Sequence, residues 1–134
     1  MGAVAVDLDV LGDVGPLFAA WLEDAARRAR VTLDPASLDS QLPGWQALLT
    51  RFAEDHAPVY LRPSAPVTAA LRRLQADGAR IGVFTAYPEE LAQVALGHLG
   101  ASRRVSELVC GDDAEARLLA VLGEARVVRD PLDL

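Results

Sequence analysis

The chain has 134 residues, a formal net charge of −6 at pH 7 and an apolar fraction of 51%, with 13 Arg, no Lys and one Cys. This length fits one domain, residues 1–134, and the acidic balance argues against a nucleic-acid partner. No apolar run approaches the ~18 residues of a membrane span. No basic segment of a signal peptide precedes Asp7, and one Cys with two distant His excludes an internal disulfide and disfavours a zinc site. We therefore expect a cytoplasmic protein without a membrane partner.

The first part of the chain predicts a buried strand followed by a group of helices. Residues 3–9 form a short apolar run that becomes acidic, which is typical of a buried strand. Gly12, Gly15 and Pro16 interrupt this run, and apolar residues then recur at helical spacing. They are Phe18, Trp21, Leu22, Ala25 and Ala29, and later Trp45, Leu48, Leu49 and Phe52. Residues 16–57 are therefore predicted to be helical.

Helices and strands alternate in the second part of the chain. The predicted order is helix 64–76, strand 79–85, helix 88–100, strand 105–110, helix 112–123 and strand 125–129. Such an alternation builds a parallel sheet that is covered by helices on both faces. The sequence predicts an α/β fold, a doubly wound parallel sheet of about four strands formed by residues 1–12 and 61–134. Residues 13–60 are a helical insert after the first strand.

Polar side chains stand where the predicted strands end, and in this architecture ligands bind at the carboxyl ends of the strands. Asp7 and Asp9 end the first strand, Thr85 ends the second, and Asp130 follows the fourth. Two neighbouring carboxylates serve either as a nucleophile beside an acid/base or as a pair that shares Mg²⁺, and turn formation is the structural alternative. Thr85 either holds an anionic oxygen or is an N-cap or near-cap residue before the next helix.

Two further alternatives stay open in the second part of the chain. Asp130 either neighbours Asp7, if the first and fourth strands pair, or belongs to a solvated tail. Asp112 and Asp113 are expected to cap the helix that follows them, rather than to take part in chemistry.

The order of these segments resembles the haloacid dehalogenase (HAD)-like hydrolase superfamily. The resemblance is carried by Val6-Asp7-Leu8-Asp9, the helical insert, Leu61-Arg62-Pro63, the helix that ends at Asp77-Gly78, and Ile81-Gly82-Val83-Phe84-Thr85. It implies a Rossmann-like core in which the insert 13–60 is a helical cap. It also implies a Mg²⁺-dependent phosphatase that acts on a small phosphorylated metabolite through an aspartyl-phosphate, as a monomer or a homodimer.

The resemblance also implies roles for single residues. Asp7 matches the nucleophile and a Mg²⁺ ligand, and Asp9 matches the general acid/base, with its main-chain carbonyl as a second Mg²⁺ ligand. Thr85 matches the hydroxyl that holds a phosphoryl oxygen, and Asp130 matches a further metal ligand. Arg117 stands near the place of the family's Lys, so it is either a substitute for that cation or an outward-facing helix residue.

The sequence departs from the family pattern in several places. Val10 and Leu11 follow Asp9 where the family has a glycine and a hydroxyl residue, the Lys is missing, and Arg129 precedes Asp130 in place of Gly. These departures favour the alternative of a catalytically impaired HAD-fold binding or regulatory module. A receiver domain of a two-component system fits less well, because it also requires a Lys and has no long helical insert. Nothing in the sequence marks the halide cradle of a dehalogenase.

Overall fold

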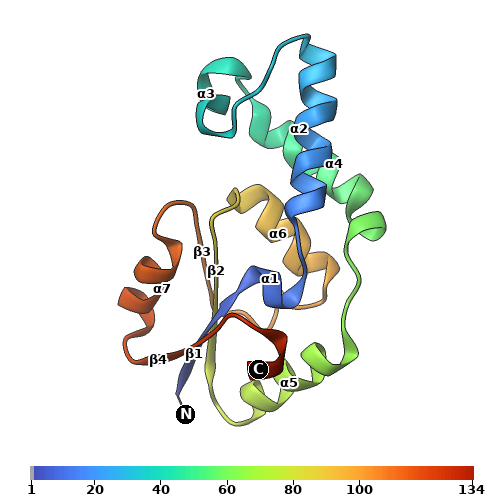
Figure 1. The fold of residues 1–134 in the computed structure, drawn as a ribbon. Helices are drawn as coiled ribbons and strands as arrows, with labels where there is room; N and C mark the ends of the chain where they lie inside the picture. Colours follow the sequence, from blue (N-terminus) through green and yellow to red (C-terminus); the bar gives the residue numbers. More distant parts are fainter. Residues whose placement is uncertain (1) are drawn as a thin grey trace.

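The computed structural model describes residues 2–134, in which four parallel strands form one sheet in the order β3-β2-β1-β4 (Figure 1). The strands are β1 (Ala3–Asp7), β2 (Arg80–Thr85), β3 (Glu107–Cys110) and β4 (Ala125–Val128). Val6 of β1 pairs with Val83 on one side and with Val128 on the other. The chain runs outward from β1 to β3 and then returns to add β4, so the strand order reverses at β1. The predicted doubly wound sheet is confirmed.

Helices cover both faces of the sheet, because successive side chains of a strand point to opposite faces. The helices of the core are α5 (Ala65–Ala76), α6 (Glu89–His98) and α7 (Ala114–Leu122). On one face α7 packs against Ala3, Ala5 and Phe84. On the other face Val4, Val6, Ile81 and Val83 belong to the larger hydrophobic core, which continues into α5, α6 and the insert.

Gly82 lets α7 lie close to the sheet. A Cβ atom at this position would be 2.7 Å from Cδ1 of Leu118, which is closer than real side chains allow. The glycine in the middle of β2 therefore has a packing role, as is common for glycine within strands.

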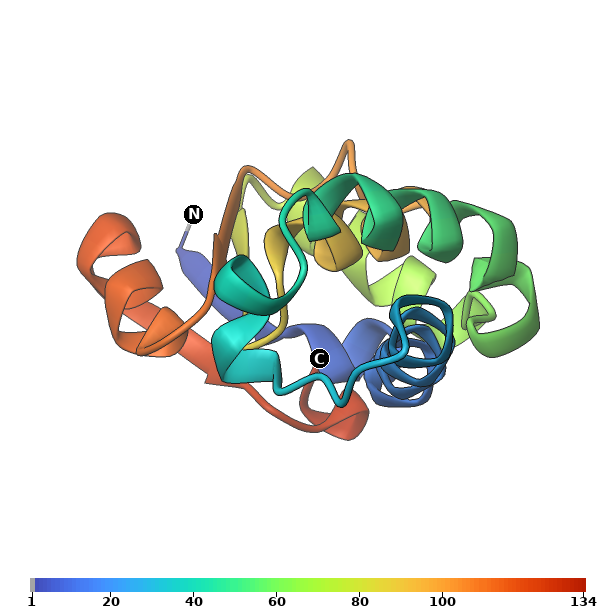
Figure 2. The same cartoon turned by 90° about the horizontal axis from the view of Figure 1, so that it is seen from above.

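The segment between β1 and α5 is helical, as the sequence predicts, but it is divided into several pieces. It contains α1 (Leu8–Leu11), α2 (Gly15–Ala29), a 3₁₀ turn at Pro35–Ser37, α3 (Leu38–Gln41) and α4 (Trp45–Tyr60). Figure 1 shows α2, α3 and α4 above the upper end of the sheet, where the strands have their carboxyl ends, and Figure 2 looks down on this region. Helix α4 packs against both α2 and α6, and this contact joins the insert to the core.

The two links between the insert and the core meet at the end of α6. A Cβ atom at Gly12 would lie 2.9 Å from Cδ1 of Leu99 and 3.3 Å from Cδ2 of Leu61. The imidazole Nε2 of His98 lies 3.0 Å from the main-chain oxygen of Leu61. The outgoing link at Gly12 and the returning link at Leu61 are therefore held together by the same part of the core.

All four strands are shorter than predicted, β2 and β4 by one residue and β1 and β3 by two. Strand β1 ends at Asp7 rather than at residue 9, because the Asp7 carboxylate accepts a hydrogen bond from the Asp9 main-chain N–H and caps α1. Strand β3 begins at Glu107 rather than at residue 105. No helix among residues 2–134 combines the length and the apolar character that crossing a bilayer requires.

Candidate active site

The candidate site lies at the carboxyl edge of the sheet, beside the point where the strand order reverses. Asp7 is the last residue of β1 and pairs with Phe84, so Thr85 stands one position further along the neighbouring strand. Asp130 follows β4 two residues after Val128, the partner of Val6. In open α/β sheets the crevice at this position is the usual ligand site. Strands β1 and β4 pair, so the condition on which the proximity of Asp130 to Asp7 depends is met.

Asp7 and Asp9 are held by a single helical turn rather than by a continuing strand. Oδ1 of Asp7 accepts the Asp9 main-chain N–H at 3.0 Å, and Asp9 is an exposed residue of α1. Val10 and Leu11, the residues that depart from the family pattern, are helical and buried in the core. Among residues 2–134 only Arg30 and Asp113 have positive φ without being glycine, so the turn after Asp9 needs no glycine at Val10.

The electrostatic surroundings of Asp9 favour its protonated form. Burial raises the pKa of the Asp9 carboxyl above its ordinary value, and the negative charges of Asp7 and Asp13 raise it further. No ion pair within residues 2–134 involves any of these three carboxylates. Asp9 therefore retains a proton more readily than an ordinary aspartate, which suits a general acid.

Thr85 is buried, with 5% of its surface exposed, and its hydroxyl proton has no acceptor among residues 2–134. Oγ1 accepts a hydrogen bond from the main-chain N–H of Tyr87 at 3.2 Å, so the hydroxyl proton remains available for donation. The residue at the N-cap of α6 is Pro88, not Thr85. The structural alternative for Thr85 is therefore the near-cap role, a turn within the β2–α6 loop, and not the N-cap itself.

Tyr87 and Asp13 lie beside the predicted site residues, although sequence reasoning did not single them out. Burial raises the pKa of the Tyr87 phenol, and the charges of Asp9 and Asp13 raise it further. The Tyr87 ring packs edge-on against Phe18 of α2, with the ring centroids 5.5 Å apart. Asp13 accepts the main-chain N–H of Gly15 at the start of α2. The position of Tyr87 two residues after a strand-end threonine is the only local signal that marks it.

Arg117 lies beside the carboxyl end of β3, and its guanidinium group donates hydrogen bonds to main-chain oxygens. Nε donates to the carbonyl of Asp112 at 3.0 Å, and Nη2 donates to the carbonyl of Cys110 at 2.5 Å. The side chain therefore closes the loop between β3 and α7, and its role as a phosphoryl-binding cation stays a prediction. Asp113 occupies the N-cap position of α7, as predicted, but its φ of 54° is left-handed and its carboxylate makes no capping hydrogen bond.

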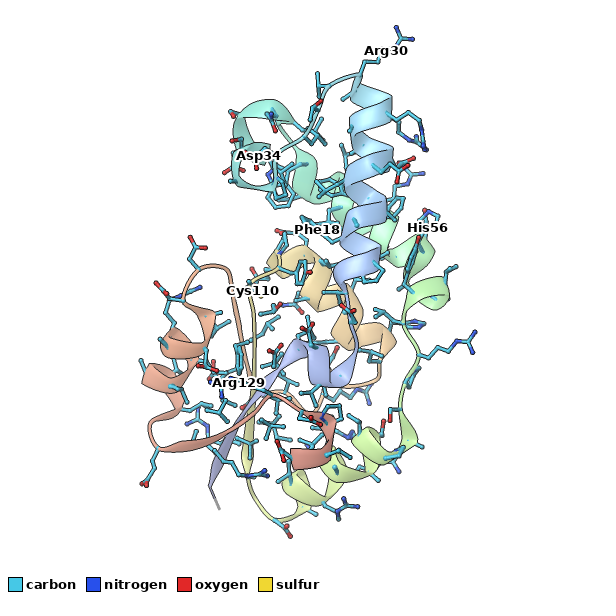
Figure 3. All side chains as sticks on the ribbon, viewed as in Figure 1. Phe18, Arg30, Asp34, His56, Cys110 and Arg129 are labelled. Carbon is cyan, nitrogen blue, oxygen red and sulfur yellow. The ribbon has the colours of Figure 1, made fainter. Side chains whose placement is uncertain are left out.

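Asp130 and Arg129 also have local partners. Oδ1 of Asp130 accepts the main-chain N–H of Leu132 at 2.9 Å and caps the short 3₁₀ turn Pro131–Asp133. Arg129 forms an ion pair with Glu115 of α7. Figure 3 shows Arg129 on the β4 side of the sheet, well below Phe18 of α2. These contacts stabilise the end of β4, and the second carboxylate oxygen of Asp130 makes no hydrogen bond among the described residues.

The donor set at this edge fits a hard divalent cation chemically, without forming a preorganised cage. No group of three or more His, Cys, Asp or Glu side chains spaced for a metal ion occurs between residues 2 and 134. Mg²⁺ is commonly held by only one or two carboxylates together with water and substrate phosphate oxygens. Asp7 ends β1 and Asp130 follows the neighbouring strand β4, so both offer such oxygens at this edge. A cation there would offset the negative charges that raise the pKa of Asp9.

Two hollows lie between helices rather than at the strand ends. One, of about 610 Å³, lies between α4 and α6 and is lined by acidic and polar side chains that include Glu54, Glu89 and His98. The other, of about 940 Å³, lies between α2 and α4 and includes Arg51 and Phe52. Neither is lined by Asp7, Asp9 or Thr85. The candidate site is therefore an edge of the sheet beneath the insert, not one of these two hollows.

Comparison with known proteins supports the fold. No protein-family model and no curated protein matches the sequence. Among solved structures, the chain is similar to one described as a "putative beta-phosphoglucomutase from Thermotoga maritima", with a TM-score of 0.60 and 22% identity over 95% of this chain and 75% of that chain. At this identity the likeness shows the fold alone. The Rossmann-like α/β architecture is thus confirmed, and the resemblance to the HAD-like superfamily stays a prediction.

Proposed function

We propose that this chain is a HAD-like phosphohydrolase that transfers a phosphoryl group from a small phosphomonoester to Asp7 and then to water. The observation that carries the proposal is the pair of carboxylates at the end of β1, where Asp7 is the N-cap of α1 and Asp9 has a raised pKa. This pair lies at the strand reversal and beside Thr85, whose hydroxyl proton is free. A nucleophile, an acid and an anion-binding hydroxyl are the groups that such a transfer needs.

In the first step an oxygen of the Asp7 carboxylate forms a bond to phosphorus, and the bond from phosphorus to the leaving oxygen breaks. Asp9 gives its proton to that oxygen, so the organic product leaves as a neutral alcohol. In the second step Asp9, now ionised, takes a proton from water while the water oxygen attacks phosphorus. The bond from phosphorus to Asp7 then breaks and inorganic phosphate is released. Thr85 donates its hydroxyl proton to a phosphoryl oxygen in both steps.

The proposal includes Mg²⁺ as the cofactor. The Asp7 carboxylate, the Asp9 main-chain carbonyl and the free oxygen of Asp130 would hold the ion. The ion would supply positive charge that offsets the repulsion between the phosphate and the Asp7 carboxylate. The insert, which lies above the strand ends, would exclude water from the edge and select the organic part of the substrate (Figure 1).

The test is the hydrolysis of phenyl phosphate with and without Mg²⁺ by the wild-type protein and by Asp7→Asn. We expect metal-dependent turnover in the wild type and a loss on the order of 10⁴-fold in Asp7→Asn, because the amide is not a nucleophile. Asp55→Asn is the matched control, because Asp55 is an exposed residue of α4 far along the chain from the site. Undiminished turnover in Asp7→Asn would remove Asp7 as the nucleophile.

A second candidate function is a non-catalytic binding module with the same fold. The observation that favours it is that Arg117, which stands nearest to the place of the missing Lys, is bonded to the carbonyl oxygens of Cys110 and Asp112. This candidate predicts no turnover of phosphomonoesters by the wild type. It also predicts that calorimetry detects binding of inorganic phosphate that Asp7→Asn does not weaken, since Asp7 then has no role in the contact.

A further inference from the structure

Tyr87 joins the core to the insert at the candidate site, and the proposed chemistry leaves its side chain without a role. The residue belongs to the β2–α6 loop, where its main-chain N–H holds Oγ1 of Thr85. Its ring packs against Phe18 of α2. Its hydroxyl oxygen would lie 3.0 Å from a Cβ atom at Gly15, so the side chain reaches the first turn of the insert. Phe18 and Gly15 are both residues of α2, and Tyr87 therefore spans the boundary between the two parts of the molecule.

The Tyr87 hydroxyl is an available hydrogen-bond donor. No hydrogen bond among residues 2–134 uses it, and it is not among the fully enclosed polar atoms of the described structure. Burial raises the pKa of this phenol above its ordinary value, and the charges of Asp9 and Asp13 raise it further, so the phenol is protonated at neutral pH. The group at this position is thus neutral, partly accessible and able to donate.

The geometry of the transfer places the organic part of the substrate next to this hydroxyl. An in-line displacement puts the leaving oxygen on the side of phosphorus opposite Asp7, within reach of the acid Asp9. A group that lies at the strand ends and touches the insert therefore meets the leaving group rather than the phosphoryl oxygens. Tyr87 lies at the strand ends, where its main-chain N–H bonds Oγ1 of Thr85, and its side chain touches the insert at Gly15 and Phe18.

We propose that Tyr87 is a specificity-determining residue, whose hydroxyl donates a hydrogen bond to an uncharged, hydroxyl-bearing organic group of the phosphomonoester. This inference rests on the proposed function, since it assumes that the ester binds with phosphorus at Asp7. The negative charge of Asp13, whose Oδ1 would lie 3.1 Å from the same Cβ position at Gly15, disfavours a second anionic group in the substrate. The site therefore selects phosphomonoesters of neutral polyols over those of carboxylic acids.

The experiment compares three esters, glycerol 1-phosphate, phenyl phosphate and phosphoglycolate, in the wild type and in Tyr87→Phe. Tyr87→Phe keeps the ring on Phe18 and removes only the hydroxyl. For glycerol 1-phosphate we expect KM to rise about tenfold with kcat nearly unchanged, because one hydrogen bond to the bound ester is lost. For phenyl phosphate, whose organic group offers no partner, we expect both constants to change less than about twofold. The wild type is expected to use phosphoglycolate about tenfold less efficiently than glycerol 1-phosphate.

Gly15→Ala provides a second variant that leaves Tyr87 itself in place. A methyl group at Gly15 would press on the Tyr87 hydroxyl at 3.0 Å and on Oδ1 of Asp13 at 3.1 Å. Both groups would shift by a few tenths of an ångström, so we expect KM for glycerol 1-phosphate to rise again. Gly97→Ala is its control, because a Cβ atom there would meet only Ser102 at 3.8 Å. Equal effects of Tyr87→Phe on glycerol 1-phosphate and phenyl phosphate, or no effect on either, would overturn the inference while leaving the proposed function intact.

Failure of the proposed function has a different signature. If the wild type hydrolyses none of the three esters, the function fails, and calorimetric binding of glycerol 1-phosphate and phenyl phosphate decides the inference. A selective loss of affinity for glycerol 1-phosphate in Tyr87→Phe would support the contact. Equal affinities in the two proteins, or no binding of either ester, would overturn it.

Discussion

The central and the outer strands of the sheet differ in how the polar groups at their carboxyl ends are used. Beside the central strands β1 and β2, Asp9 has a raised pKa, and the hydroxyl protons of Thr85 and Tyr87 have no acceptor among residues 2–134. Beside the outer strands β3 and β4, Arg117 is bonded to main-chain carbonyls and Arg129 is paired with Glu115. The polar groups beside the central strands are thus available to a ligand, whereas those beside the outer strands stabilise their own loops. The groups available for chemistry are therefore concentrated beside Asp7.

The largest effect among the variants beside Asp7 is expected for Asp9→Asn. The amide cannot give a proton to the leaving oxygen, so kcat for glycerol 1-phosphate should fall about 10²–10⁴-fold. The loss should be much smaller for phenyl phosphate, because phenolate leaves with less need of a proton. Steady-state kinetics with both esters measures the difference. Equal losses for the two would show that Asp9 is not the acid.

The Thr85 hydroxyl is tested by Thr85→Val, with Thr85→Ser as the control that retains the hydroxyl. Valine removes the donor to the phosphoryl oxygen and leaves the Tyr87 N–H without an acceptor, at a cost of about 1–3 kcal/mol in the free energy of unfolding. We expect kcat to fall roughly 10–10²-fold in Thr85→Val and to stay near the wild-type value in Thr85→Ser. Turnover and chemical denaturation are measured on both variants. Wild-type kcat in Thr85→Val would exclude the contact.

A smaller effect is expected beside the outer strand β3. Arg117→Ala removes two hydrogen bonds to main-chain oxygens, so the free energy of unfolding should fall by about 1–2 kcal/mol. We expect kcat/KM to change less than about threefold, because the guanidinium is already engaged within its own loop. A loss of turnover that is restored in Arg117→Lys would instead identify Arg117 as the phosphoryl-binding cation. This result would show that groups beside an outer strand also take part in the chemistry.

The smallest effect concerns the stability of Asp9→Asn. The folded state raises the pKa of Asp9, so ionisation of this carboxyl destabilises the protein, and stability is lost as the pH rises through the pKa of the folded state. Asparagine cannot ionise, so Asp9→Asn should melt roughly one or two degrees above the wild type at pH 7, a small gain because the group is largely exposed. The difference should vanish below the ordinary carboxyl pKa of 3.8. A gain that is independent of pH would exclude this cause.

Most of the fold could be predicted from the sequence, because local patterns decide it. Apolar runs of strand length alternate with helical spacings, and Asp77-Gly78 and Gly123 mark the ends of helices. The end of β1 could not be predicted, because residues 3–9 form a single apolar run that becomes acidic. The hydrogen bond from the Asp9 N–H to the Asp7 carboxylate, which ends the strand at Asp7, is visible only in the structure. The absence of a capping hydrogen bond from the Asp113 side chain likewise depends on the left-handed backbone of this residue, which an aspartate permits but does not require.

The candidate site was predictable only where it coincides with strand ends. Asp7 and Thr85 follow from the rule that ligands bind at the carboxyl edge, and the pairing of β1 with β4 brings Asp130 to the same region. Tyr87 could not be found in this way, because its importance comes from a contact with Phe18, which lies far from it in the sequence. The orientation of Arg117 depends on carbonyl oxygens that only the folded loop brings together.

The central claim is that Asp7 carries the phosphoryl group. The most direct measurement identifies the residue to which the phosphoryl group is attached. The wild-type protein is mixed with phenyl phosphate and Mg²⁺, quenched in acid and digested, and the peptide that ends at Arg27 is sequenced by mass spectrometry. The account predicts one phosphoryl group on Asp7 in the wild type and none in Asp7→Asn. A phosphoryl group on any other residue would contradict the account. So would turnover that proceeds in the wild type without a covalent intermediate and is undiminished in Asp7→Asn.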